Sequence, residues 1–154
     1  MARDDPFYLA TVIRVRINSG DFEAAQAAFD HWPESDRGFD YFKSSGLVSE
    51  EVRGDDQVAS LAFMAALEIW PGHCDASLQH RRSNCLMRLG RSDEAAECRS
   101  AASRIDSLME LDLHTRLRQL LADLTSRETL AEMAEFYQRL GRHREANEWR
   151  KLAR

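Results

Sequence analysis

The histidine and cysteine residues that could bind a metal gather at His73, Cys74, His80 and Cys85. Zinc sites usually place two of their ligands close together, as in Cys-x₂-Cys. His80 and Cys85 are five residues apart on one expected helix, so their side chains do not share a face. The spacing therefore favours Cys85 and Cys98 as small core residues, and we expect neither a metal nor a cofactor.

Motifs for catalysis are absent from the sequence. It has no Ser/His/Asp motif, no glycine-rich phosphate loop and no helix with paired Glu and His residues of the metalloenzyme type. Carboxylates are abundant, but no motif places one of them for acid or base work. We therefore expect a protein that is not an enzyme.

Basic side chains form the most distinctive local charge. A run at His80, Arg81 and Arg82 is followed by Arg88 and Arg91. Arginine can hold a carboxylate or a peptide backbone through charge-assisted hydrogen bonds. The simpler alternative is a solvated face of a helix, and the run by itself does not separate the two.

The composition limits the classes of partner. The chain has 154 residues, of which 44% are hydrophobic and 31% charged, with a formal net charge of −5. An acidic balance argues against nucleic-acid binding. No segment reaches the roughly 18 apolar residues of a membrane span, and the first residues, Met-Ala-Arg-Asp-Asp-Pro, do not form the apolar core of a signal peptide. Three cysteines are too few for a disulfide framework, so we expect a cytoplasmic protein with no membrane contact.

The elements that position these residues all have helical periodicity. Apolar residues recur at three- and four-residue steps from Pro6 to Asn18, and no segment alternates with period two, which predicts an all-α fold. Residues 34–57 allow two interpretations, two short helices over about 39–44 and 49–53 or one helix broken at Gly46. Further on, Thr125 to Glu128 form an expected capping box. The leucine-rich stretch 108–124 either continues the preceding helix or forms a separate one.

Four glycines are expected to end helices, namely Gly20, Gly54, Gly90 and Gly141. Two of them lie in the phrase Leu-Gly-Arg-x-x-Glu-Ala, and each is followed by an alanine five residues later. Their separations of 34, 36 and 51 residues follow from these positions, and the last equals 34 plus the length of one extra helix.

The chain resembles the tetratricopeptide-repeat family in the residues that follow these glycines. The family pattern of small, aromatic, small and proline positions is complete in one repeat, at Gly54, Ala59, Phe63, Ala66 and Pro71. The other three match in part, at Gly20, Ala25 and Phe29, at Gly90, Ala95 and Ala102, and at Gly141, Ala146 and Ala153. In the last two repeats Arg99 and Arg150 replace the aromatic residue.

This resemblance implies an α-solenoid of antiparallel helix pairs, coiled into a right-handed superhelix. The repeats would cover residues 6–39, 40–73 (degenerate), 76–109 and 127–154, with an inserted helix at 108–124, in a single domain of residues 1–154. The last repeat runs to Arg154 without an added capping helix, which suggests either a region of a larger protein or a final helix with a polar outer side.

The resemblance also implies a non-catalytic scaffold that binds a protein or peptide partner on its concave face. The positions that map to this face include Arg14, Asn18, His80, Asn84, Arg88 and Gln138. Chaperone-binding members of the family use a lysine-and-asparagine clamp, but this chain has only Lys43 and Lys151, so that function is not carried over. The alternatives are a structural module that forms a homodimer through the 108–124 helix or the C-terminal helix, and an accessory domain of an enzyme.

Overall fold

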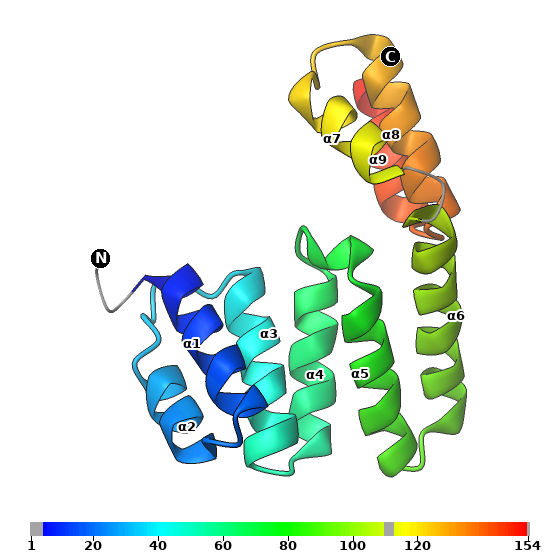
Figure 1. Cartoon of the computed structure of the whole chain (residues 1–154). Coiled ribbons are helices and arrows are strands. Elements are labelled where there is room, and N and C mark those ends of the chain that lie inside the picture. The colour runs from blue at the N-terminus through cyan, green and yellow to red at the C-terminus, as the bar shows by residue number, and fades with distance from the viewer. Residues whose placement is uncertain (1–4, 110–112, 154) are drawn as a thin grey trace. The chain divides into compact units, whose positions relative to one another are not determined.

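A computed structural model describes residues 5–109 and 113–153, and within these residues it contains helices and no β-strand (Figure 1). The all-α prediction is confirmed. The α-helices are α1 (Pro6–Asn18), α2 (Phe22–Asp30), α3 (Phe39–Leu47), α4 (Asp56–Leu67), α5 (Ala76–Arg88), α6 (Ser92–Met109), α7 (Leu113–Ala122), α8 (Arg127–Arg139) and α9 (His143–Leu152). A π-helical turn, η1 (Val48–Val52), follows α3, and a 3₁₀ turn, η2 (Gly72–Cys74), precedes α5.

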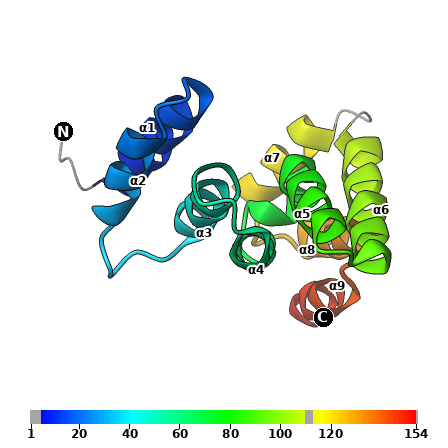
Figure 2. The ribbon, with the colours of Figure 1, turned by 90° about the horizontal axis from the view of Figure 1, so that it is seen from below.

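The chain divides into two compact units, Met1–Arg99 and Ser100–Arg154. The boundary falls inside α6. In the first unit, α1 packs against α2 and α3, α3 packs against α4, and α4 packs against α5. Figure 2 shows α1 beside α2 and α3 beside α4. In the second unit, α8 packs against α9 and also contacts α7.

The four helix-ending glycines all have positive φ, between 64° at Gly54 and 79° at Gly141. In three of the turns, the N–H after the glycine donates to the carbonyl five residues back, as Arg91 does to Leu86 at 2.8 Å. This bond closes the helix end that glycine makes possible. After Gly54 the bond runs from Asp55 to Ser49, six residues back, because the π-helical turn contains one additional residue.

The repeated phrase Leu-Gly-Arg-x-x-Glu-Ala forms a helix start. Arg91 pairs with Glu94, and Arg142 pairs with Glu145, each at 2.6 Å. The glutamate lies in the first turn, where negative charge is favourable. The alanine that follows is fully buried in both cases. The phrase therefore fixes a turn and a close helix contact.

Side chains cap most of the remaining helix starts. The carboxylates of Asp5, Asp21, Asp55 and Asp75 each accept a hydrogen bond from the backbone N–H three residues later. The predicted capping box at Thr125 is wrong by one residue. Ser126 is the N-cap of α8, because the Thr125 hydroxyl donates to the Asp123 carboxylate at 2.6 Å instead.

Residues 39–52 form one uninterrupted helical run, α3 followed by η1, so the interpretation as two short helices is wrong and the interpretation as one helix is wrong only in its break at Gly46. Gly46 lies within α3 and does not break it. The Phe63 ring of α4 occupies the space that a Cβ on Gly46 would need. The glycine is therefore explained by the close approach of α4.

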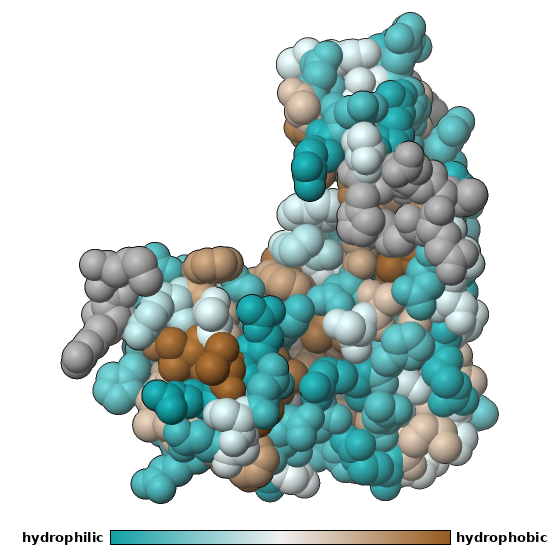
Figure 3. Space-filling view, in the orientation of Figure 1, coloured by the Kyte–Doolittle hydropathy of each residue, from teal (hydrophilic) through white to brown (hydrophobic). Residues whose placement is uncertain are grey.

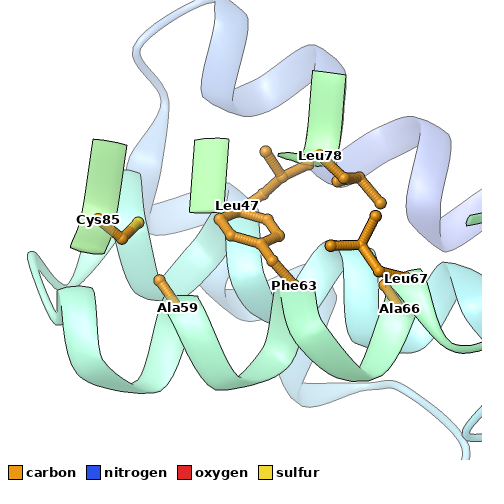
Figure 4. Close-up of a cluster of buried hydrophobic side chains, with 7 residues drawn as sticks. All are labelled: Leu47, Ala59, Phe63, Ala66, Leu67, Leu78 and Cys85. Carbon is orange, nitrogen blue, oxygen red and sulfur yellow. The ribbon is translucent and has the colours of Figure 1, made fainter. Parts of the chain in front are cut away.

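The core of the first unit forms where α3, α4 and α5 meet. Phe63, Leu78 and Cys85 are fully buried there and are packed with Leu47, Ala59, Ala66 and Leu67 (Figure 4). A second cluster contains Leu9, Ile13, Trp32 and Val48. The alanines that follow the four glycines, Ala25, Ala59, Ala95 and Ala146, are all fully buried, which lets neighbouring helices pack closely.

The leucine-rich stretch is partly core and partly surface. Leu117 and Leu120 on α7 are buried, whereas Leu121 and Leu124 are each 39% exposed. Leu111 lies outside the described residues. α6 ends at Met109 and α7 begins at Leu113.

Candidate functional site

A groove between α1 and α3 contains Arg14, one of the residues that the concave-face mapping selected. It encloses about 90 Å³. α1 contributes Phe7, Ala10, Thr11 and Arg14, and α3 contributes Asp40, Lys43, Ser44 and Leu47. These side chains, named here the α1–α3 groove, combine apolar and charged groups in one small depression.

The apolar part of the groove is unusually open. Phe7 is 75% exposed, although burial of a phenylalanine contributes about 1.5–3 kcal/mol. Leu47, on the opposite wall, is 8% exposed. In Figure 3, an apolar area lies over α1 among hydrophilic side chains. An incoming apolar side chain can therefore cover Phe7 and remove its ring from water.

The two cations of the groove differ in their partners. Lys43 Nζ lies 2.9 Å from Asp75 Oδ2 and 5.3 Å from the centre of the Phe39 ring. The Arg14 guanidinium is exposed. It makes no hydrogen bond or ion pair with any of the residues that the structure describes. Arg14 is therefore available to an external carboxylate or carbonyl group.

Asp75 holds Lys43 at the edge of the groove. Burial alone would raise the pKa of the Asp75 carboxyl, but hydrogen bonds from Lys43, Ser77 and the Leu78 N–H outweigh it and lower the pKa. The carboxylate is also the N-cap of α5. It stays ionised at neutral pH, so the lysine position is fixed by a permanent charge.

Arg88, a predicted peptide contact on α5, is engaged inside the protein. Its guanidinium donates to both Asp56 oxygens at 2.6–2.9 Å and to Glu50 Oε1 at 2.8 Å. Arg81 donates to Glu50 Oε2 at 2.6 Å and to Glu51 at 2.8 Å. These five residues are called the Glu50 network. Each carboxylate oxygen of Glu50 thus accepts a hydrogen bond from one arginine of α5.

The Glu50 network joins η1 and the start of α4 to α5. The Glu50 side chain is only 9% exposed. The hydrogen bonds from Arg88, with its positive charge, hold the pKa of Asp56 below its usual range despite partial desolvation. The arrangement satisfies its own charges, and this indicates a structural role for Arg88.

The other predicted site residues lie apart from the groove. Asn18 is exposed at the end of α1, and His80 and Asn84 are exposed on α5. Gln138 is in the second compact unit, where it contacts His143 Nδ1 at 2.7 Å and Arg150 at 3.0 Å. Of the six predicted residues, only Arg14 lines the groove.

Sequence reasoning missed the α3 wall of the groove. Asp40, Lys43, Ser44 and Leu47 lie in the stretch whose helix could not be assigned, so its positions could not be mapped onto a face. One signal was available, because Lys43 is one of only two lysines in the chain.

The remaining chemistry of the chain is limited. No group of three or more His, Cys, Asp or Glu side chains is placed to hold a metal ion among the described residues. Cys85 is fully buried, and burial raises the pKa of its thiol to about 12. In the part of the chain that the structure describes, no helix combines the length and the apolar character that crossing a membrane requires.

Comparisons with protein-family models, with curated proteins and with solved structures found no match to this chain.

Proposed function

We propose that the first compact unit binds an extended peptide segment of a partner protein in the α1–α3 groove. The observation that carries this proposal is the pairing of an unengaged Arg14 with a 75% exposed Phe7 in one groove. A free guanidinium can recognise a carboxylate, and an open aromatic ring can pack against an apolar side chain. The protein is a non-catalytic scaffold in this proposal.

We further propose that the chain is a tetratricopeptide-like solenoid. Support comes from the glycine-closed helix ends, from the buried alanine five residues after each glycine, and from the packing of α1 on α2 and α3, of α3 on α4 and of α4 on α5. In such an array the first helices of the repeats line one face. Within the first unit α1, α3 and α5 would occupy these positions, and α1 and α3 form the groove.

The groove chemistry suggests which peptides bind. Lys43 is paired with Asp75, whereas Arg14 has no carboxylate partner among the described residues, so an acidic side chain is favoured near Arg14. The volume of about 90 Å³ suits one side chain and is too small for a folded element. The expected ligand is a segment with an acidic residue close to an apolar one.

Selection from a random peptide library displayed on phage tests the proposal. The library is enriched on the wild-type chain, and single peptides are then measured against the Phe7→Ala and Arg14→Glu variants. We expect the enriched peptides to be acidic and to lose about tenfold or more in affinity with either variant, since a charge-assisted hydrogen bond contributes about 1.5–3 kcal/mol.

The matched control is Arg144→Glu. Arg144 is an exposed arginine of α9 that makes no hydrogen bond or ion pair with a described residue, so the variant changes the net charge equally outside the groove. Peptides that bind wild type and Arg14→Glu equally well would refute the groove as the site. So would a selection that enriches no peptide.

A second candidate function is self-association through the C-terminal helix. Leu152 on α9 is 66% exposed, the highest value among the large apolar residues after Phe7. Trp149 on the same helix is half-buried, with its ring centre 6.2 Å from that of Tyr137. Light scattering over a wide concentration range tests this function. A dimer that Leu152→Glu dissociates supports it, and a monomer at all concentrations excludes it.

A further inference from the structure

A second depression lies wholly within the second compact unit. It is formed by the later part of α6 together with the end of α8, and its volume is about 430 Å³. Its lining, named here the α6–α8 pocket, consists of Ser100, Ser103, Arg104, Ser107, Leu108 and Arg139. All of its lining residues except Leu108 are exposed, so it is a depression open to solvent.

The polar lining of this pocket is rich in hydrogen-bond donors. Ser100, Ser103 and Ser107 follow one another at three- and four-residue steps, which places their hydroxyls on one face of α6. Two guanidinium groups join them, and the described lining contains no carboxylate. A guanidinium carries five N–H donors and a permanent positive charge. The pocket is thus positively charged in a protein whose net charge is −5.

Arg104 is held in position at the pocket wall. Its Nη1 donates to Ser100 Oγ at 2.9 Å. Its guanidinium also lies against Gly141, where an added Cβ would come within 3.4–3.6 Å of three of its atoms. The hydrogen bond to Ser100 uses one of its N–H donors, and the others have no carboxylate partner among the described residues.

Arg139 has fewer polar interactions than Arg104. It is exposed at the end of α8 and makes no hydrogen bond or ion pair with a residue that the structure describes. Elsewhere Arg81, Arg88 and Arg142 are each paired with a carboxylate of their own chain. The two pocket arginines therefore differ from these, because no carboxylate among the described residues pairs with them.

We propose that the α6–α8 pocket binds a phosphoryl group. Two guanidinium forks and three hydroxyls offer more donors than the two oxygens of a carboxylate can accept, and they match the three terminal oxygens of a phosphate monoester. The volume leaves room for the organic group that carries the phosphate, and Leu108 is the apolar residue of the lining. The proposal does not depend on the groove of the first unit.

Isothermal titration calorimetry with the full chain tests this pocket. The titrants are glycerol 3-phosphate, inorganic phosphate and glycerol. We expect glycerol 3-phosphate to bind and glycerol not to bind. Tighter binding of glycerol 3-phosphate than of inorganic phosphate identifies an organic phosphate as the source, and equal binding identifies free phosphate. Both outcomes support a phosphoryl site.

Variants locate the binding. Arg139→Gln is the main variant because its side chain is exposed and makes no hydrogen bond or ion pair with a described residue, and Ser103→Ala is the second. We expect Arg139→Gln to weaken binding about tenfold or more, and the matched Arg144→Gln variant on α9 to leave it unchanged. Absence of heat for both phosphates at millimolar concentration would overturn the proposal. Equal affinity of wild type and Arg139→Gln would overturn it as well.

Discussion

The ring of Phe63 lies against the backbone of Gly46, in the space where any side chain at position 46 would begin. Alanine in place of a mid-helix glycine ordinarily adds about 0.5–1 kcal/mol of stability. Here the sign should reverse, because a methyl group would have to displace a fully buried ring. We expect Gly46→Ala to lower the free energy of unfolding by about 1–3 kcal/mol, measured by urea denaturation.

A double-mutant cycle checks the cause. Phe63→Leu shortens the side chain that meets position 46, so Gly46→Ala should cost less in the Phe63→Leu background than in wild type. Additive effects of the two changes would show that the ring is not the obstacle.

The Glu50 network should make part of the free energy of unfolding depend on pH. Arg88→Ala removes the hydrogen bonds that lower the pKa of Asp56. A carboxyl with a lowered folded-state pKa stabilises the protein fully above its unfolded pKa of about 3.9, and this contribution disappears as the pH falls through the folded value. Because the arginine is half exposed, we expect Arg88→Ala to cost about 1–2 kcal/mol at pH 7.

The measurement is urea denaturation of wild type and Arg88→Ala at pH 7 and at about pH 2.5. The difference between the two proteins should shrink at the lower pH. Arg144→Ala, an exposed arginine without a described partner, is the control and should show no such dependence. A difference of the same size at both pH values would contradict the role of Asp56.

Local signals explain why much of the fold could be predicted. Gly20, Gly90 and Gly141 end helices through conformations and bonds that span only a few residues, and the aspartate caps are equally local. The stretch around Gly46 could not be interpreted, because its glycine is required by Phe63, a residue of another helix. The sequence alone does not distinguish a glycine that is needed for helix packing from a glycine that breaks a helix.

Only the α1 wall of the candidate site could be predicted from the sequence. The family resemblance selected Arg14 and also Arg88, and both lie on helix faces with suitable spacing. What separates them is their partners: Glu50 and Asp56 lie 38 and 32 residues before Arg88, and the π-helical turn η1 brings Glu50 within reach. No periodic pattern contains that information, so the engagement of Arg88 required the structure.

The three thiols should differ in reactivity. Cys85 and Cys98 are buried, and burial raises the pKa of both, to about 12 for Cys85. The thiolate is the reactive form, so both should resist alkylation in the native state. Cys74 is only half-buried. At pH 8 we expect iodoacetamide to modify Cys74 first, as identified by mass spectrometry, and all three residues after denaturation. Rapid native modification of Cys85 would contradict this order.

Two buried serines should respond in opposite ways to replacement by alanine. Ser83 donates to the Ala95 carbonyl at 2.9 Å and accepts from Arg99 at 3.1 Å, so Ser83→Ala should cost about 0.5–1.5 kcal/mol. The fully buried Ser49 hydroxyl has no hydrogen-bond partner among the described residues. Removing an unsatisfied polar group relieves its desolvation, so Ser49→Ala should leave stability unchanged or raise it. Urea denaturation of both variants decides the matter, and a loss at Ser49 equal to that at Ser83 would show that the Ser49 hydroxyl has a partner.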